Sequence, residues 1–415
     1  MLRRVAGAYR SAFSGLPREV WILALASLVN RSGTMVLPFL GLYLTTRLGF
    51  SVLAAGHVLS LYGLGALVGA WLGGYLADRT GPVGVQVASL LATGAGFLIL
   101  GQLHGRTAIG AAVLGLSVVA ECFRPAMFTA VAQRSAPAVR TRSLALVRLA
   151  VNLGMSVGPA VGGVLAVRHY GLLFVVDAVT CWMAAALLWA TVRRAPVAGV
   201  DRMAESARVP ASPWRDPPFL AFLLIMLLMG TIFFQIMSTL PLYFREVYRF
   251  PEDTIGILLG LNALVIVAVE MVLVRALERH DHLIVVGLGC LAVGAGFGLM
   301  PLGSGRLFAA FTVLVWTVGE MLSIPMANSV ATTRVPGGSG RYLGAYFLGF
   351  SGAFVLAPTI GTTVYERAGP NALWFGVAGL GALLCLGCVA LARRFRETSP
   401  PATRGAATGA PGNRE

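Results

Sequence analysis

The sequence predicts an all-α membrane protein with 12 transmembrane helices, in two six-helix bundles related by a parallel pseudo-two-fold repeat. Composition is the first evidence: 57% of the 415 residues are hydrophobic and only 12% are charged, whereas a soluble domain carries about 25% charged residues. Length is the second, since a span needs about 20 apolar residues and the chain has room for about a dozen. No long alternating strand pattern appears, so the spans are predicted to be helices.

A polar segment rich in Arg and Pro divides the apolar runs into two sets. We expect helices at about residues 18–46, 51–77, 83–103, 107–132, 143–167, 171–192, 219–245, 252–275, 282–302, 307–331, 342–365 and 371–392. The expected domains are an N-terminal bundle, a cytoplasmic linker, a C-terminal bundle and a disordered cytoplasmic tail, at residues 1–192, 193–217, 218–392 and 393–415.

Charge predicts the orientation of the chain in the membrane. The formal net charge is +15, and all 32 basic residues are Arg. In a soluble protein this balance would indicate nucleic acid, but most Arg residues fall in predicted loops, so we expect no nucleic-acid partner. With both termini and the linker on one side, 22 Arg lie on that side and seven on the other. The asymmetry predicts a multi-pass protein of the plasma (bacterial inner) membrane with both termini cytoplasmic.

An internal repeat relates the two halves of the chain. A shift of 200 residues matches Leu42-Tyr43 with Leu242-Tyr243, Phe50 with Phe250, Gly56 with Gly256, Asp78-Arg79 with Glu278-Arg279, and Pro125 with Pro325. Six helices per half is an even number, so both copies have the same orientation in the membrane. Two such bundles generally leave a cavity between them, and rocking one against the other alternates access to it.

The polar turn between the second and third spans carries the first family signature. Gly74-Tyr75-Leu76-Ala77-Asp78-Arg79-Thr80-Gly81 resembles the loop between helices 2 and 3 of the major facilitator superfamily, although Pro82 and Val83 replace the usual basic pair. The resemblance implies a gating motif of Gly74, Asp78, Arg79 and Gly81, in which the Asp sits at a helix start and latches the two halves in one state. A carboxylate near a helix N-terminus is favoured by roughly 0.3–1 kcal/mol. The alternative is a plain turn with loop charges.

A second motif resembles that of the 12-helix drug:proton antiporters, the multidrug exporter group of this superfamily. Gly158, Pro159, Gly162 and Gly163 form a Gly-Pro-x-x-Gly-Gly pattern on the fifth span, which the resemblance implies seals the interface between halves. The alternative is generic packing of small residues. Arg124 resembles the intramembrane Arg of helix 4 in the same group.

Charged side chains inside predicted spans are candidates for the proton and substrate pathway, because each costs at least about 2.5–3.5 kcal/mol at the bilayer centre unless it faces a cavity or a partner. The candidates are Arg31, Glu121, Arg124, Arg148, Asn152, Glu270 and Glu320. Glu121 and Arg124 share a helix face and are able to pair, and Arg148 and Asn152 share another.

Two of these carboxylates, Glu320 and Glu270, are candidate proton carriers, since a carboxylate without a nearby cation is readily protonated. The alternative is a structural salt bridge, for Glu270 with Arg275. Many drug exporters place an acid in the first span, where this chain has Arg31, which suggests an anionic or neutral substrate, or a pairing of Arg31 with an acid on another helix.

Aromatic residues are candidates for a hydrophobic substrate pocket, although at helical spacing they also suit packing or lipid contact. They are Tyr62, Phe123, Phe128, Phe233, Phe234, Tyr346 and Phe350. Cys385 and Cys388 form a C-x-x-C pattern within an apolar run, where packing is the expected role. The His residues lack metal-ligand spacing, so we expect no metal site, no catalytic residues and no cofactor.

These features predict a secondary active transporter that exports hydrophobic small molecules, drug-like compounds or secondary metabolites, in exchange for protons by alternating access. Its partners would be the lipid bilayer, a small-molecule substrate and protons, and it would work as a monomer. The alternatives are a transporter of one specific metabolite, in either direction, and a transport-inactive membrane sensor. A membrane enzyme is disfavoured because no cluster of catalytic or metal-binding residues appears. ATP-driven transport is disfavoured because the sequence contains no Walker loop.

Overall fold

Residues 14–191, 212–277, 279–334 and 339–398 are described by a computed structural model. In this part of the chain, 12 helical spans are long and apolar enough to cross a membrane, which confirms the all-α class and the predicted number of spans. Most of the predicted linker and the tail beyond residue 398 lie outside the described residues, so their boundaries stay predictions.

The N-terminal bundle consists of α2 (Arg18–Ser32), α3 (Val36–Leu42), the π-helical turn η1 (Tyr43–Arg47), α4 (Val52–Thr80), α5 (Pro82–Leu100), α6 (Arg106–Glu121), α7 (Phe123–Arg134), α8 (Pro137–Arg168) and α9 (Gly171–Thr191). The C-terminal bundle consists of η2 (Pro213–Arg215), α10 (Pro217–Phe233), η3 (Phe234–Met237), α11 (Thr239–Glu246), α12 (Glu252–Leu277), α13 (His282–Gly298), η4 (Met300–Leu302), α14 (Arg306–Thr333), α15 (Ser339–Ala368) and α16 (Pro370–Thr398).

Four spans of the described chain are built from successive helices, and two helices extend furthest beyond their predicted ends. Span 1 consists of α2, α3 and η1, span 4 of α6 and α7, span 7 of α10 and η3, and span 9 of α13 and η4. Helix α8 begins at Pro137 rather than residue 143, and α16 continues to Thr398 rather than ending at residue 392. Hydropathy marks the part of a helix inside the apolar layer, whereas backbone hydrogen bonding continues into the polar surroundings.

Local chemistry explains where helices begin and end. The Ser51 side chain accepts a hydrogen bond from the Ala54 amide, at 3.2 Å, and caps α4. Helix α4 ends at Gly81, whose φ of +93° lies in the region that favours glycine, and Pro82 starts α5 directly afterwards. The predicted polar turn is therefore a sharp reversal of a single residue between two helices.

Asp216 caps α10 by accepting from the Phe219 amide, and Arg334 at the end of α14 donates to both of its carboxylate oxygens, at 2.8 and 3.0 Å. Tyr342 donates to the same carboxylate. Burial opposes ionisation of Asp216, but these hydrogen bonds and the Arg334 charge outweigh it and lower the pKa of that carboxyl below its ordinary value.

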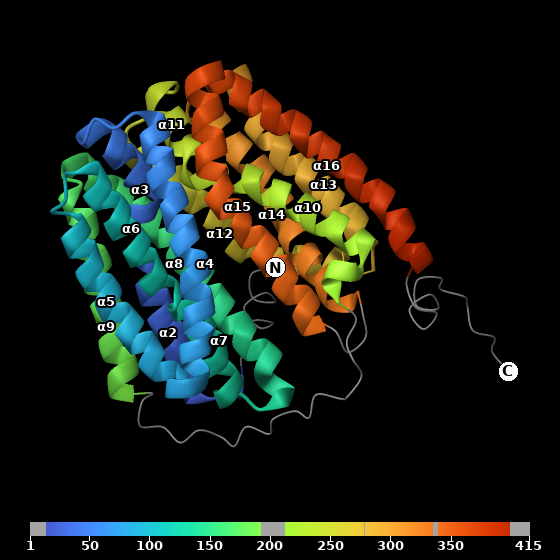
Figure 1. Cartoon of the computed structure of the whole chain (residues 1–415), viewed down its shortest axis with the longest axis horizontal. Coiled ribbons are helices and arrows are strands. Elements are labelled where there is room, and N and C mark those ends of the chain that lie inside the picture. The colour runs from blue at the N-terminus through green and yellow to red at the C-terminus, as the bar shows by residue number, and fades with distance from the viewer. Residues whose placement is uncertain (1–13, 192–211, 278, 335–338, 399–415) are drawn as a thin grey trace.

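The two bundles meet mainly along two helix pairs, α4 with α15 and α8 with α12, and α3 also contacts η3 and α11 (Figure 1). We call the end of the molecule with the loops 48–51, 101–105 and 247–251 the far end, and the end with Gly81 and the start of α10 the linker end. In Figure 1, α3 and α11 lie close together at the upper, far end, and the ribbons of the two bundles diverge toward the linker end.

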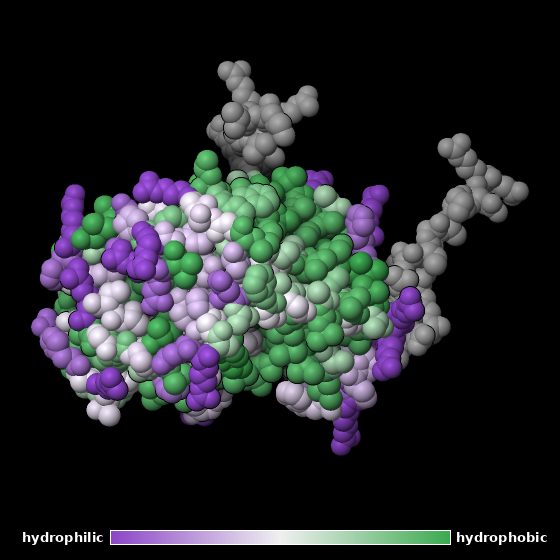
Figure 2. All heavy atoms as spheres, turned by 90° about the horizontal axis from the view of Figure 1, so that it is seen from above, coloured by the Kyte–Doolittle hydropathy of each residue, from purple (hydrophilic) through white to green (hydrophobic). Residues whose placement is uncertain are grey.

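Small residues permit close helix packing within and between bundles. A Cβ atom added to Gly65, Gly69 or Gly73 of α4 would lie 1.9–2.5 Å from atoms of span 4. The outer surface is correspondingly apolar: large hydrophobic side chains such as Leu383 and Leu386 of α16 are more than 60% exposed. Figure 2 shows a broad hydrophobic area over the C-terminal bundle, as expected of a lipid-facing surface.

Candidate functional site

The first sequence motif lies at the linker end, where α4 turns into α5. The Arg79 guanidinium lies 4.4 Å from the centre of the Tyr75 ring, and Asp78 is exposed. Within the described residues Asp78 makes no hydrogen bond or ion pair. Asp78 occupies the last turn of α4, where the helix dipole disfavours a carboxylate, so the expected placement at a helix start is wrong.

The second motif lies where α8 meets both span 1 and the opposite bundle. A Cβ atom on Gly158 would lie 3.0 Å from the Arg31 carbonyl oxygen, and one on Gly162 would lie 2.9 Å from Met35 Cβ. On the other side of α8, a Cβ on Gly163 would lie 2.3 Å from the Glu252 carbonyl oxygen.

Helix α12 approaches the same motif with a glycine of its own. A Cβ atom on Gly256 would lie 2.2 Å from the Pro159 carbonyl oxygen. The backbones of α8 and α12 are therefore in direct contact at Gly163 and at Gly256. At either position, any side chain larger than hydrogen would push the two helices apart. The Gly-Pro motif thus occupies the interface between the bundles near the far end.

Span 1 is interrupted between Ser32 and Val36, and a buried carboxylate supports the interruption. The Met35 and Val36 amides each donate to Asp177 of α9 at 3.0 Å, and Asp177 is only 2% exposed. Without Asp177, amide groups at the start of α3 would be buried without acceptors. Asp177 therefore stabilises the fold.

Arg31 lies beside this interruption, in the last turn of α2, and is half-buried. Its Cβ lies 2.7 Å from where a side chain on Gly154 of α8 would begin. Among the described residues no hydrogen bond or ion pair engages the Arg31 guanidinium, so the expected pairing with an acid on another helix is not formed in this structure.

Glu121 and Arg124 form the predicted ion pair, with 3.5 Å between carboxylate and guanidinium. The Glu121 side chain is 12% exposed and that of Arg124 is 58% exposed. Tyr62 of α4 lies within electrostatic range of both residues and of Arg31. These side chains are the polar groups that the N-terminal bundle contributes to the candidate site.

Arg148 of α8 pairs with Glu270 of α12, across the interface between the bundles. The alternative pairing of Glu270 with Arg275 is wrong, because the carboxylate is bound from the opposite bundle. Asn152 lies one turn further along α8, half-buried, and makes no hydrogen bond in the part of the chain described.

Glu320 of α14 is held by a neutral partner. The Asn262 side-chain amide donates to the Glu320 carboxylate at 2.8 Å and lies 3.1 Å from the Thr317 hydroxyl. No cation pairs with Glu320 within the described residues, although it lies within electrostatic range of Arg148 and Glu270. Of the two candidate proton carriers, Glu320 is therefore the one without an ion-pair partner.

Five of the seven candidate aromatic residues come together. The array, named here the aromatic array, consists of Tyr62, Phe233, Phe234, Tyr346 and Phe350 together with Phe354, which sequence analysis missed. Tyr62 belongs to the N-terminal bundle and contacts Phe354 of the C-terminal bundle, with ring centres 5.7 Å apart. Phe123 is instead buried inside the N-terminal bundle, and Phe128 is 49% exposed elsewhere.

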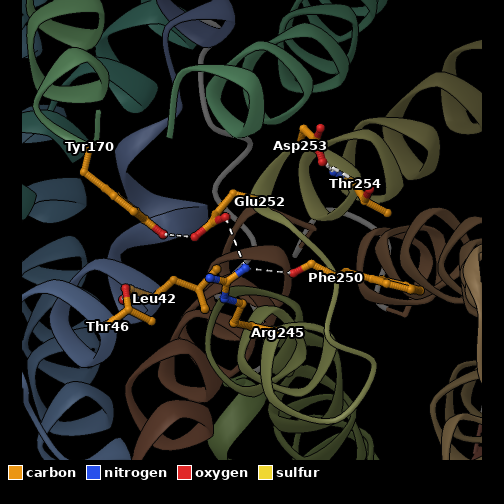
Figure 3. A network of polar contacts seen from close by, with 8 residues as sticks. All are labelled: Leu42, Thr46, Tyr170, Arg245, Phe250, Glu252, Asp253 and Thr254. Carbon is orange, nitrogen blue, oxygen red and sulfur yellow. Dashed lines mark hydrogen bonds and ion pairs between the residues drawn. The ribbon is translucent and has the colours of Figure 1, made fainter. Parts of the chain in front are cut away.

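A polar network that sequence analysis also missed joins the bundles at the far end (Figure 3). The Tyr170 hydroxyl, from the loop between α8 and α9, donates to the Glu252 carboxylate at 2.9 Å. Arg245 lies 3.4 Å from the other Glu252 oxygen and donates to the Phe250 carbonyl. Burial and the adjacent carboxylate raise the pKa of Tyr170, which keeps its hydroxyl proton available for donation.

A second carboxylate of the C-terminal bundle binds the N-terminal bundle at the same end. The Leu53 amide, in the first turn of α4, donates to Glu366 of α15 at 2.7 Å, and the helix dipole favours a carboxylate there. The Ser60 and Thr359 hydroxyls bond across the same helix pair, 2.8 Å apart. One sequence feature could have drawn attention to Glu252: it lies between Phe250 and Gly256, which the 200-residue repeat matches with Phe50 and Gly56. Its partner in the other bundle could not be predicted, because contacts between bundles leave no local sequence pattern.

Metal chemistry has no support in the described residues, where no group of three or more His, Cys, Asp or Glu side chains is placed to hold an ion. The described residues form twelve candidate spans in two six-helix bundles. The Arg148–Glu270 pair and the Tyr62–Phe354 ring contact join the bundles, an arrangement that defines a polytopic membrane transporter.

Comparison with known proteins identifies the family. The profile of the Major Facilitator Superfamily matches residues 20–351, and the chain belongs to this family of transporters, which are not enzymes. The chain is 25% identical over 395 residues to the uncharacterized MFS-type transporter YqjV of Bacillus subtilis, covering 92% of this chain and 95% of that one. It is 25% identical over 352 residues to the multidrug resistance protein MdtH of Aeromonas hydrophila, covering 80% and 83%.

A crystal structure of the peptide transporter POT in complex with sulfate superposes with a TM-score of 0.80. The identity is 17%, and the match covers 93% of this chain and 96% of that one. At this identity the likeness shows the fold alone.

Proposed function

We propose that this transporter is a secondary active exporter of hydrophobic small molecules, drug-like compounds or secondary metabolites, in exchange for protons. The contact between Gly163 and Glu252 carries the proposal, because it puts the antiporter-like motif of α8 against the opposite bundle, where a tight seal prevents leak. The similarity to MdtH supports the same class, whereas a shared fold with a peptide transporter does not favour peptides.

The proposed orientation follows the Arg asymmetry, with the linker end and both termini in the cytoplasm of the plasma membrane. We also propose domain boundaries at residues 192 and 217 and a monomeric state, with the C-terminal bundle extending to the end of α16 at Thr398. In this orientation the far end is extracellular, and its closure by the Gly163, Glu252 and Glu366 contacts corresponds to a state closed to the outside.

Proton exchange is assigned to Glu320. Its carboxylate has an amide partner and no cation, so in a membrane span the neutral, protonated form costs less than the charged form. Arg148 lies within electrostatic range, and hydration of the Glu320 carboxylate during rocking would favour release of the proton. Proton binding and bundle movement are coupled in this way.

The experiment measures export of N-phenyl-1-naphthylamine, a neutral hydrophobic dye, from exporter-deficient bacterial cells. We expect efflux to stop when an uncoupler dissipates the proton gradient, and Glu320→Gln to abolish gradient-driven efflux. The control variant Glu246→Gln alters a carboxylate that binds Tyr365 within the C-terminal bundle, and should retain efflux. Export that persists in uncoupler, or in Glu320→Gln, contradicts the proton mechanism.

A further inference from the structure

Arg31 stands out among the charged groups of the spans because no hydrogen bond or ion pair with the described residues engages its side chain. Glu121 pairs with Arg124 and Glu270 with Arg148, Asp177 accepts backbone amides, and Glu320 binds Asn262. The Arg31 guanidinium has no such partner in the described chain. A lone cation inside a membrane span costs at least about 2.5–3.5 kcal/mol, a cost that an anionic ligand would offset.

Arg31 lies at the depth where both bundles have broken helices. Span 1 breaks directly after it, and span 7 breaks at η3, the corresponding position of the repeat. The helix that follows the first break packs against the second, since α3 contacts η3 and α11. In the 200-residue repeat Arg31 corresponds to Thr231, three residues before η3. Because both halves have the same orientation in the membrane, Arg31 and η3 lie at similar depths.

The aromatic array begins at this same break. Phe233 ends α10 and Phe234 starts η3, with ring centres 5.4 Å apart. Phe350 and Phe354 of α15 continue the array toward Tyr62, which is within electrostatic range of Arg31. Five of the six rings are half-buried, so part of each surface is available for contact, whereas Tyr346 is buried.

Resting on the proposed export function, we propose that Arg31 binds the anionic group of the substrate while the aromatic array holds its apolar body. The substrates of this site then include aromatic carboxylates and sulfonates. Guanidinium binds a planar carboxylate, or two oxygens of a tetrahedral oxyanion, through two parallel hydrogen bonds. Aromatic rings stack on one another or pack edge to face. Each nearby carboxylate has a partner or a proton. Glu121 and Glu270 are neutralised by Arg, the Met35 and Val36 amides donate to Asp177, and Glu320 is the proposed proton carrier.

Binding of two matched probes to the purified full-length protein in detergent tests the proposal without any proton gradient. The probes are 2-naphthoate and 2-naphthamide, which share the ring system and differ in charge, and calorimetry at pH 7.5 measures their affinities. We expect naphthoate to bind about tenfold or more tightly than naphthamide, the worth of a charged hydrogen bond. Arg31→Gln should remove this preference and leave naphthamide binding unchanged, and Arg31→Lys should restore part of it.

Three outcomes overturn the proposal: no preference in the wild type, no measurable binding of either probe, or an equal loss for both probes in Arg31→Gln. The last would mean that Arg31, as a cation in the last turn of α2, only stabilises that helix. Thermal melting of each variant separates this case from loss of a ligand contact. Because the measurement needs no transport, loss of proton coupling in the efflux experiment leaves its result intact, and the two proposals fail separately.

Discussion

Removing the hydroxyl of Tyr170 should open the far end of the transporter. The Tyr170→Phe substitution keeps the ring, which is 4% exposed, and deletes the donor that joins the N-terminal bundle to Glu252. Glu252 stays beside Arg245 of its own bundle, so the variant removes the contact between bundles without leaving an isolated buried charge.

The magnitude follows from the kind of bond that is lost. A hydrogen bond to a charged acceptor contributes about 1.5–3 kcal/mol, and Glu252 is 8% exposed, so solvent screens it little. If both groups are hydrated when the far end opens, the substitution shifts the equilibrium toward opening by about 10- to 100-fold, at about 1.4 kcal/mol per factor of ten. Glu252→Gln should shift it in the same direction.

Spin labels at residues 167 and 247 report the separation of the bundles at the far end. Val167 at the end of α8 and Val247 after α11 are both exposed, and the five native Cys are replaced first. In Tyr170→Phe, the population with the longer distance should rise, as measured by double electron–electron resonance.

The matched control is Tyr365→Phe. Tyr365 donates to Glu246 at 2.8 Å, a Tyr–Glu bond of the same kind, but both residues belong to the C-terminal bundle. This control should leave the distance distribution unchanged. Identical distributions in the wild type, Tyr170→Phe and Tyr365→Phe would refute the assignment of Tyr170 and Glu252 to closure of the far end.

Two further predictions concern the linker end. If Asp78 belongs to the proposed gating motif, Asp78→Asn should slow dye efflux. The substitution should leave 2-naphthoate affinity and melting temperature nearly unchanged, because Asp78 is exposed and makes no hydrogen bond or ion pair with the described residues. A loss of affinity instead would exclude a gating role. Asp216→Asn should destabilise the protein at pH 7 by about 3 kcal/mol, since it removes the carboxylate that binds the buried Arg334 guanidinium. Because folding lowers the pKa of Asp216, its stabilisation is complete above the ordinary Asp value of about 3.9 and is lost as the pH falls through the folded value. Melting curves between pH 3 and 7 should therefore depend less on pH in Asp216→Asn, and an unchanged acid dependence would contradict this role.

The fold was predictable because membrane spans obey a strong local rule. Apolar length sets each span, and the shift of 200 residues pairs the halves without any knowledge of contacts. The interruption of span 1 was not predictable, since it depends on Asp177, 142 residues away from Met35. A break satisfied by a distant carboxylate leaves no trace in the hydropathy of the segment itself.

The site was partly predictable for the same physical reason. Glu121 and Arg124 are one helical turn apart, so helix geometry alone brings them together. The partner of Glu270 was mispredicted because proximity in sequence favoured Arg275, whereas the bundle interface supplies Arg148. Residues that bind across bundles, such as Glu252 and Glu366, depend on a packing geometry that no single helix encodes.

The pairing of α8 with α12 places two different contacts on one interface. The Arg148–Glu270 pair and the Gly163–Glu252 contact lie 15 residues apart on α8 and 18 apart on α12, or roughly 22 and 27 Å along the helices. A rotation of about 10° about the ion pair would therefore move the far ends by roughly 4 Å, enough to separate a hydrogen bond. Pro159 of α8 lies between the two contacts, where its ring removes a backbone hydrogen bond and permits bending. The far end is thus able to open while Arg148 stays paired, so a central ion pair and a releasable outer contact are compatible on the same two helices.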